Sequence, residues 1–392
     1  MKIVVASKGN PESVKTWSGI PYYIYKAFEK KGHDVSGVTL IDPREPWYYN
    51  LYRRIYYKLF KKWLWVEMEP YFLKEIARQF DKDVAAINPD IVVLIHGHFL
   101  AYTTFKQPTI IVHDTTFAQI IHYYSDFTAL ADKTIRLGNE MYQRGLDRAA
   151  VAVFSSSWAS QSALSDYKTP ASKIHTVPLG ANLSSVPKAE NVGRWIDKRS
   201  KKDTCSFLFL GIDWERKGGP DALRFIAELN RKGIKSHLTV VGCSPEITAA
   251  HQHFVNQLGF LRKDVADDAK KLEELFIETT ALLLPSLAEC YGCVYCEANA
   301  YGLPALGRDT GGVSEAIRDG VNGLLMRTDE SPEEFANRWA DIWNNRTTYA
   351  NLSTNSRLEF DQRLNYDVFV DKLEELAAKF DNSLETTESP LV

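Results

Sequence analysis

The stretch CSFLFLGIDWERKGGPDALRFIAELNRKGIKSHLTVVG, residues 205–242, contains the pattern that decides the fold. It opens on an apolar run, passes through a loop with two consecutive glycines, and continues into a segment with apolar residues at helical spacing. A second apolar run, HLTVVG, ends it. The first run lacks the alternation of a half-exposed strand, which indicates a buried parallel strand. The stretch is therefore predicted to form a strand, helix and strand in succession.

The same rhythm recurs along most of the chain. Further apolar runs begin at Lys2, His33, Asp90, Thr109, Ala150, Lys173, Ala281 and Pro304. Most are separated by enough residues for one helix, so we predict an α/β fold with two Rossmann-like, doubly wound domains in series. The polar, charged stretch at residues 183–204 lacks apolar periodicity and is the predicted linker.

The predicted domains span residues 1–182 and 183–364. A segment with apolar residues at helical spacing predicts a helix at about 365–380. The polar tail at 381–392 is expected to fray.

Composition excludes several classes of protein. The 392 residues are enough for two domains at roughly 150 residues each. Fifty acidic against 47 basic side chains give a formal charge of -3, so nucleic acid is not an expected partner. Five cysteines and an amino-terminal segment unlike a signal peptide predict a reducing cytosol. No run of 18 apolar residues predicts a membrane span.

The most informative segment for function is ALLLPSLAECYGCVYCEANAYGLPAL, residues 281–306. A strand is followed by a loop with Glu289, and a helix is expected to begin near Gly292. Ligands of open α/β sheets bind outside the carboxyl ends of the strands, where Glu289 is expected to lie. By itself, Glu289 can also be explained as a carboxylate that interacts with the helix dipole.

The start of this predicted helix is suited to an anion. The backbone N–H groups of Tyr291, Gly292 and Cys293 can face a phosphate, and the helix dipole favours negative charge there. A diphosphate is the natural ligand. Glu297, in the second turn, can then accept two hydrogen bonds from ribose hydroxyls; the alternative for Glu297 is a solvated helix residue.

Many residues of this region, taken in sequence order, resemble the Glu-x7-Glu signature of the retaining glycosyltransferases of family 4. The matching positions are Pro285, Ser286, Glu289, Tyr291, Gly292, Glu297, Ala298, Gly302, Pro304, Gly311, Gly312 and Glu315. The resemblance implies a GT-B fold, in which two Rossmann-like domains face each other across a cleft and the 365–380 helix crosses back to the first domain. It also implies transfer of a sugar from a nucleoside diphosphate sugar, with UDP favoured, to a hydroxyl acceptor.

The resemblance further implies roles for individual residues. Glu289 contacts hydroxyls of the donor sugar, Glu297 contacts the ribose, and Leu261 beside the turn after Gly259 lines the nucleobase. The configuration of the transferred sugar is retained, and neither a metal nor a cofactor is required. The first domain is expected to bind the acceptor, which is a saccharide, a lipid or a small molecule.

A second group of polar residues follows a strand in FLGIDWERKGGPDAL, residues 209–223. Gly218 allows a close approach of the backbone to a ligand. Arg216 and Lys217 supply positive charge beside that turn, which a departing nucleoside diphosphate requires. The family places an arginine and a lysine here on the diphosphate, although many members carry the arginine directly after the strand. A charged surface loop is the alternative.

In the amino-terminal half, His113 and Asp114 follow an apolar strand directly. Family members commonly place a histidine and an acidic residue at this edge, facing the donor sugar. His96 and His98 also follow a strand and either line the acceptor side or make local hydrogen bonds. Gly19 precedes a predicted helix, where its backbone can reach the donor phosphate; many relatives have a second glycine at the position of Ser18.

Cys290, Cys293 and Cys296 form a C-x2-C-x2-C run, a spacing found in iron–sulfur sites. A cluster or zinc site needs a fourth ligand, and these three thiols would occupy the helix start assigned to the diphosphate. We therefore expect no metal site, and buried reduced thiols instead.

Residues 46–80 concentrate aromatic and basic side chains. Such a segment can lie in a membrane interface as a peripheral contact. It can also form an acceptor platform or a lid, or it can simply pack on its own domain.

Two rival functions are compatible with these observations. An epimerase of sugar nucleotides or a phosphorylase can share the architecture. A non-enzymatic protein that binds sugar nucleotides is the rival from another class, although pure recognition does not require charge placed on a leaving group.

Overall fold

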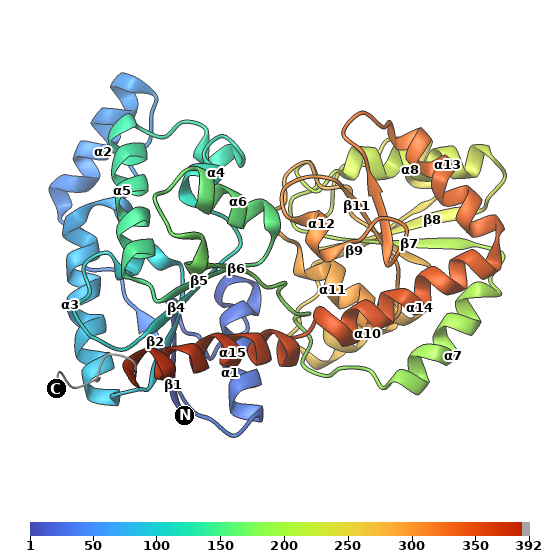
Figure 1. Cartoon of the computed structure of the whole chain (residues 1–392). Coiled ribbons are helices and arrows are strands. Elements are labelled where there is room, and N and C mark those ends of the chain that lie inside the picture. Colours follow the sequence, from blue (N-terminus) through green and yellow to red (C-terminus); the bar gives the residue numbers. More distant parts are fainter. Residues whose placement is uncertain (386–392) are drawn as a thin grey trace. The chain divides into compact units, whose positions relative to one another are not determined.

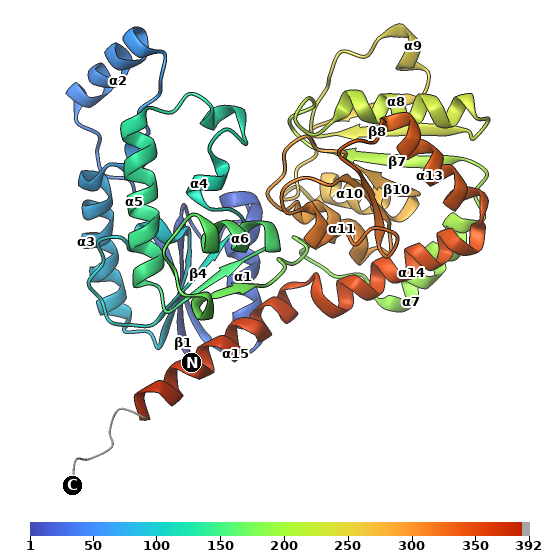
Figure 2. The ribbon, with the colours of Figure 1, turned by 45° about the horizontal axis from the view of Figure 1, so that its top comes forward.

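The computed structural model describes residues 1–385 and divides them into two compact units (Figures 1 and 2). Unit 1 comprises Met1–Val177 together with the described residues from Phe369 onward, and unit 2 comprises Pro178–Val368. The division falls slightly before the boundary expected at residue 182. Among the described residues, no helix combines the length and the hydropathy that a membrane span requires.

Unit 1 is built on a six-stranded parallel sheet in the order β2-β1-β3-β4-β5-β6 within the described residues. Its strands are β1 Lys2–Lys8, β2 Asp34–Leu40, β3 Ile91–Ile95, β4 Thr109–His113, β5 Val151–Phe154 and β6 Ile174–Thr176. Every residue of β3, β4 and β5 is buried, as expected of parallel strands covered on both faces. The strands thus begin near the predicted apolar runs.

Unit 1 also contains helices, several of which pack on this sheet. They are α1 Ile20–Lys30, α2 Trp47–Phe60, α3 Pro70–Ile87, α4 Phe117–Ile120, α5 Asp132–Arg148, α6 Ser157–Ser165 and α15 Tyr366–Glu385, with short 3-10 turns η1 Thr16–Gly19, η2 Val66–Met68, η3 Gly97–Leu100, η4 Ser125–Phe127 and η5 Ala171–Lys173. Val4 and Ala6 of β1 share one core with Phe80 of α3 and Met141 of α5. Successive strand residues face opposite sides, so the other face of β1 is free to pack with α1.

Unit 2 repeats the plan with a six-stranded parallel sheet in the order β12-β11-β10-β7-β8-β9 within the described residues. Its strands are β7 Cys205–Leu210, β8 Ser236–Val241, β9 Val255–Gly259, β10 Ala281–Leu283, β11 Ala305–Arg308 and β12 Gly323–Met326. Its helices are α7 Ala189–Ser200, α8 Gly219–Arg231, α9 Ala249–Gln252, α10 Ala266–Glu278, α11 Cys293–Ala300, α12 Val313–Ala316, α13 Pro332–Asn344 and α14 Arg346–Arg363. The edge strand β12 was not predicted.

The predicted linker at 183–204 is wrong, because most of it is helix α7. Val192 and Ile196 are buried, and so is Arg199. The Arg199 guanidinium donates hydrogen bonds to the carbonyl oxygens of Phe276 at 3.2 Å and of Gly302 at 2.6 Å. This charged stretch therefore forms a packed helix whose buried face includes an arginine.

The carboxyl-terminal prediction is extended by the structure. The helix expected at 365–380 is α15, which runs from Tyr366 to Glu385. The tail predicted at 381–392 therefore begins within a helix, and its residues 386–392 lie outside the described residues.

Replacing Arg199 by Met should lower the free energy of unfolding of unit 2 by about 3 kcal/mol, because several buried carbonyl groups lose their donor. Denaturant titration of the full chain measures this change. Arg194→Met, on the exposed side of the same helix, is the control and should stay within about 0.5 kcal/mol of the parent. Equal stability of the two variants would contradict the structural role of Arg199.

Candidate functional site

Three loops meet at the carboxyl edge of the sheet in unit 2. They follow β7, β10 and β11. The Leu287 N–H donates to the Arg216 carbonyl at 2.8 Å, the Thr310 hydroxyl donates to the Leu287 carbonyl at 3.3 Å, and the Gly312 N–H donates to the Glu289 carbonyl at 3.3 Å. These bonds bring the two groups of polar residues, separate in the sequence, to one place.

Lys217 and Glu289 form an ion pair across two of these loops. Glu289 is only 8% exposed. Nη1 of Arg216 donates to the Ala288 carbonyl at 3.0 Å and lies 3.9 Å from Oε2 of Glu289. The structure thus brings together Arg216, Lys217 and Glu289, the three residues expected at the diphosphate and the donor sugar. Their contacts with a donor stay predictions.

The fold itself requires glycine at position 218. Its φ is +77°, and a Cβ atom there would lie 2.1 Å from the Pro285 carbonyl oxygen. Any other residue would push apart the loops after β7 and β10. The close approach that the sequence suggested is therefore one between two loops, and the approach of a ligand stays a prediction.

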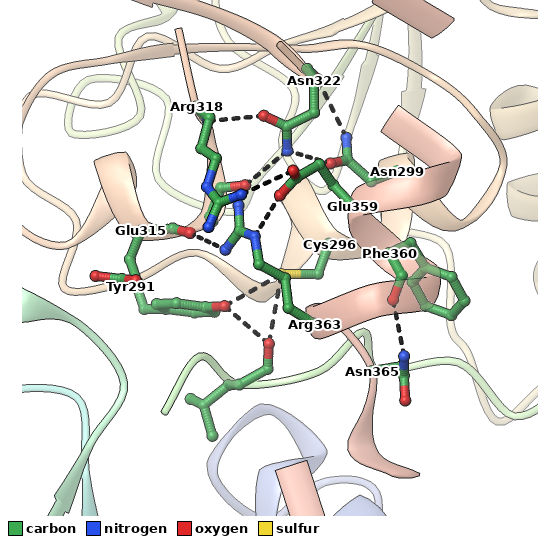
Figure 3. Close-up of polar contacts among 12 residues, drawn as sticks. Tyr291, Cys296, Asn299, Glu315, Arg318, Asn322, Glu359, Phe360, Arg363 and Asn365 are labelled. Atoms are coloured by element: carbon green, nitrogen blue, oxygen red, sulfur yellow. Dashed lines mark hydrogen bonds and ion pairs between the residues drawn. The ribbon is translucent and has the colours of Figure 1, made fainter. Parts of the chain in front are cut away.

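Helix α11 begins after Gly292, whose φ is +88°. Cys293 is its first residue and is half-buried. The preceding Tyr291 is buried, and its hydroxyl donates to the Leu179 carbonyl at 2.8 Å and lies 3.5 Å from Sγ of Cys296 (Figure 3). Burial raises the pKa of Tyr291 well above its ordinary value, so the side chain is neutral, and its hydrogen bond to the Leu179 carbonyl holds it in place. The anion contact predicted for this helix start is not tested by these bonds.

A network of charged side chains supports α12 (Figure 3). Arg318 donates to Glu359 at 2.9 Å, and Arg363 pairs with the same carboxylate. Arg363 also donates to the Glu315 carbonyl. Helix α12, which includes Glu315, is thereby fastened to α14.

Glu297 is 3% exposed and pairs with Lys263, whose Nζ lies 2.6 Å from Oε1. Burial raises the pKa of Glu297, and the charge of Lys263 lowers it in part. Lys263 also donates to the Asn182 carbonyl at 3.2 Å. Sequence reasoning missed Lys263, although it lies two residues after Leu261 in the turn assigned to the nucleobase.

Leu261 follows β9 closely and is half-buried. The carboxyl ends of β8 and β9 adjoin, because the Gly242 N–H donates to the Gly259 carbonyl at 2.8 Å. The side chain beside Leu261, Phe260, is exposed. The predicted role of Leu261 at a nucleobase stays a prediction.

The cysteine run lies in this region, and its three side chains are reduced thiols. Cys290 and Cys296 are buried, and burial raises the pKa of Cys296 to about 12, which keeps it protonated. Among the residues that the structure describes, no group of three or more His, Cys, Asp or Glu side chains is arranged to hold a metal ion.

In unit 1, His113 ends β4 and is only 2% exposed. Its Nε2 accepts a hydrogen bond from the Gly97 N–H at 2.5 Å. Burial lowers the pKa of His113 well below its ordinary value, so the ring is neutral. The hydrogen bond from Gly97 positions the turn after β3, where His96 and His98 lie. The contacts of His113 and of half-buried Asp114 with a donor sugar stay predictions.

The turn after β3 forms a polar cluster that the sequence analysis foresaw only in part. Nε2 of His98 lies 3.3 Å from Glu67, and Lys8 at the end of β1 lies 2.5 Å from the same carboxylate. Burial alone would raise the pKa of Glu67, but His98 and Lys8 lower it to about 2. Burial, together with His98, lowers the pKa of His96 to about 4. Lys8 and Glu67 were missed, although Lys8 directly follows an apolar run.

Gly19 is the N-cap of α1 and has a φ of +89°. Trp17 and Ser18 before it also have positive φ, at 40° and 57°. The ring of Trp17 lies 4.5 Å from that of His96. This left-handed turn therefore adjoins the cluster after β3, at the carboxyl edge of its sheet.

The fold and these edges define a protein of two Rossmann-like units with charged loops where the strands end. Residues 194–359 match the family model of glycosyl transferases group 1, and residues 21–185 match that of Glycosyltransferase Family 4. The chain belongs to this family of glycosyltransferases, which confirms the resemblance seen in the sequence.

The chain is also similar to proteins of known function or structure. It is 27% identical over 223 residues to a D-inositol 3-phosphate glycosyltransferase of Paenarthrobacter aurescens, covering 54% of this chain and 53% of that protein. The chain thus spans about half the length of this curated relative. The sucrose-phosphate synthase structure from Thermosynechococcus elongatus has a TM-score of 0.65 at 16% identity, covering 99% of both chains. Anabaena HepE in complex with UDP has a TM-score of 0.61 at 14% identity, covering 98% of this chain and all of that one.

Replacing Lys263 by Met should raise the pKa of Glu297 further, because burial then acts unopposed by the lysine. Carbon-13 NMR titration of glutamate carboxylates measures the pKa, with Glu297→Gln to assign the resonance. The pKa of Glu297 is higher in the folded protein than in the unfolded chain, so the free energy of unfolding falls as pH rises from the unfolded-state pKa to the folded-state pKa. The free energy of unfolding of Lys263→Met should therefore fall by more than that of the parent over this pH range. Lys270→Met, on exposed α10, is the control; an unchanged pKa in Lys263→Met would refute the pairing.

Proposed function

We propose that this protein is an enzyme that transfers a sugar from a nucleoside diphosphate sugar to a hydroxyl group, with retention of configuration and without a metal ion. The observation that carries the proposal is the pair of buried carboxylates, Glu289 and Glu297, each held by a lysine at the carboxyl edge of unit 2. The family membership of the chain supports a sugar-transfer activity.

The proposed donor site uses groups of opposite charge for different parts of the donor. Lys217 and Arg216 face the diphosphate, together with the backbone at the start of α11. Glu289 accepts hydrogen bonds from the sugar hydroxyls, and Glu297 accepts them from the ribose. In the structure, each of these carboxylates pairs with a lysine. When the sugar nucleotide binds, its hydroxyl groups replace the lysines as hydrogen-bonding partners of the carboxylates.

The proposed reaction breaks the bond between the anomeric carbon and the diphosphate oxygen. The acceptor hydroxyl oxygen forms the new bond on the same face, and its proton moves to the departing phosphate oxygen. Negative charge grows on the diphosphate during this step, and Lys217 and Arg216 stabilise it as a divalent ion does in other transferases. We assign no covalent intermediate to Glu289, because attack on the same face by the acceptor hydroxyl needs none.

Unit 1 is proposed to bind the acceptor, which is a saccharide, a lipid or a small molecule. The polar cluster of His96, His98 and Glu67 at the edge of its sheet offers donors and acceptors for hydroxyl groups. From the resemblance to the family, we also propose that His113 contacts the donor sugar and that the backbone of Gly19 contacts the donor phosphate. UDP is favoured as the nucleotide because the similar HepE structure contains UDP.

A panel of nucleoside diphosphates tests the donor site. UDP at 100 times its dissociation constant should stabilise the protein by about 2.7 kcal/mol, seen as a rise in the unfolding temperature. Glu297→Gln should weaken UDP binding by about tenfold or more, because the ribose loses a charged acceptor. Glu274→Gln, on exposed α10, is the control. If neither UDP nor any other diphosphate of the panel shifts the unfolding temperature, the proposed function fails.

Replacing Lys217 by Ala should lower turnover by about a hundredfold, by analogy with the loss of one oxyanion donor. Release of UDP from UDP-sugars, measured with and without a panel of saccharide acceptors, gives the rate. Lys270→Ala should keep the parent rate. Release that needs no acceptor, or a new sugar nucleotide formed from the donor alone, would point to hydrolysis or epimerisation; full turnover by Lys217→Ala would refute the diphosphate role.

A further inference from the structure

Helix α2 presents a continuous apolar stripe to solvent. None of its 14 residues, all of them described, is buried. The exposed residues Trp47, Leu51, Ile55 and Leu59 recur every four positions, so they lie on one face of the helix. Tyr48 and Tyr52 widen this face, and the six side chains are between 43% and 79% exposed. A single exposed leucine is ordinary, but a contiguous apolar face marks an interaction surface.

The opposite face of α2 fixes the direction of the stripe. Tyr49 packs edge-on against Phe72 of α3, with ring centroids 5.7 Å apart. Tyr57 stacks on Trp63 at 3.8 Å, just after the helix. These contacts hold α2 to unit 1 by one side and leave the stripe outward, and Figure 2 shows α2 at the periphery of this unit.

Positive charge surrounds the stripe. The sequence from 46 to 66 contains no Asp or Glu and contains Arg53, Arg54, Lys58, Lys61 and Lys62. Arg53 pairs with Glu45 and Lys62 with Asp132, both outside this stretch. Arg54 and Lys58 lie one turn apart along the edge of the stripe. Neither forms an ion pair with any side chain that the structure describes. A local surplus of positive charge therefore stands on a chain whose formal charge is -3.

The chemistry of this surface selects among its conceivable occupants. A second copy of the chain docked through the same stripe would bring the Arg54 and Lys58 side chains of both copies together with no acidic partner from residues 46–66, and like charges repel. A saccharide needs hydrogen-bonding groups, which Leu51, Ile55 and Leu59 lack. An anionic lipid surface matches all three properties: an apolar interior, a zone that suits Trp and Tyr, and negative headgroups.

We propose that α2 lies on the surface of a bilayer that contains anionic lipids. Trp47, Leu51, Ile55 and Leu59 insert below the headgroups, while Arg54 and Lys58 contact lipid phosphates. The helix is about 21 Å long, at 1.5 Å per residue, and lies in the plane of the interface. This binding is a property of unit 1 and is independent of the proposed donor site in unit 2.

Sedimentation of the full chain with vesicles tests the proposal. Vesicles of phosphatidylcholine with about one third phosphatidylglycerol should bind the protein at least about tenfold more tightly than pure phosphatidylcholine vesicles do, and salt should weaken the binding. The double variant Leu51→Gln and Leu59→Gln should bind about tenfold or more weakly, because two leucines no longer enter the apolar layer. Leu164→Gln, an exposed leucine of α6, is the matched control.

A second pair of variants tests the charges. Arg54→Glu with Lys58→Glu should abolish the preference for anionic vesicles. Lys82→Glu with Lys106→Glu, two exposed lysines of the same unit, changes the net charge equally and should keep most of the preference. All variants should bind UDP as the parent does, so failure here and failure of the donor site are separable.

Three results would overturn the proposal. One is equal binding of the parent to neutral and anionic vesicles, or no binding to either. Another is unchanged binding by the Leu51 and Leu59 double variant. The third is a dimer in analytical ultracentrifugation that the same double variant dissociates, which would assign the stripe to a second copy of the chain.

Discussion

Two carboxylates lie below the surface of unit 2, where burial disfavours their charged form, and a lysine from another loop reaches each of them. This requirement for a counter-charge organises the edge of the sheet. Lys217, after β7, pairs with Glu289, after β10, and Lys263, after β9, pairs with Glu297 in α11. The loops are therefore placed before any ligand arrives. Under the proposed function, much of the desolvation of these groups is already complete in the folded protein, so a donor meets a preorganised site.

Unit 1 follows the same principle with different residues. Glu67 is held charged by Lys8 and His98, where β1 and β3 end. Buried His113, also in this unit, is neutral and accepts a hydrogen bond from a backbone N–H. In both units the strands supply a rigid, apolar base, and the polar groups gather where the parallel strands stop. This arrangement explains why two sheets with similar topology can carry unrelated side chains at their edges.

The strands with long apolar runs, such as β3 and β7, could be predicted from sequence because both of their faces are buried. The edge strand β12 was missed although its four residues are buried. Helix α7 was mistaken for a linker because the sequence does not show that Arg199 is buried among carbonyl groups. Lys263 was missed for a similar reason: its partner, Glu297, lies 34 residues away, and only the tertiary fold brings them together.

Helix α15 gives the chain an unusual order of assembly. It begins at the end of unit 2, yet from Phe369 onward it belongs to unit 1, where Lys31 pairs with Asp371, and His33 lies 2.6 Å from Glu374. On the ribosome, which releases the chain from its amino terminus, the first unit to emerge must wait for this late segment while the whole of the second is made. Until then, Lys31 and His33 lack their acidic partners on α15, and this part of the nascent chain is open to chaperone binding.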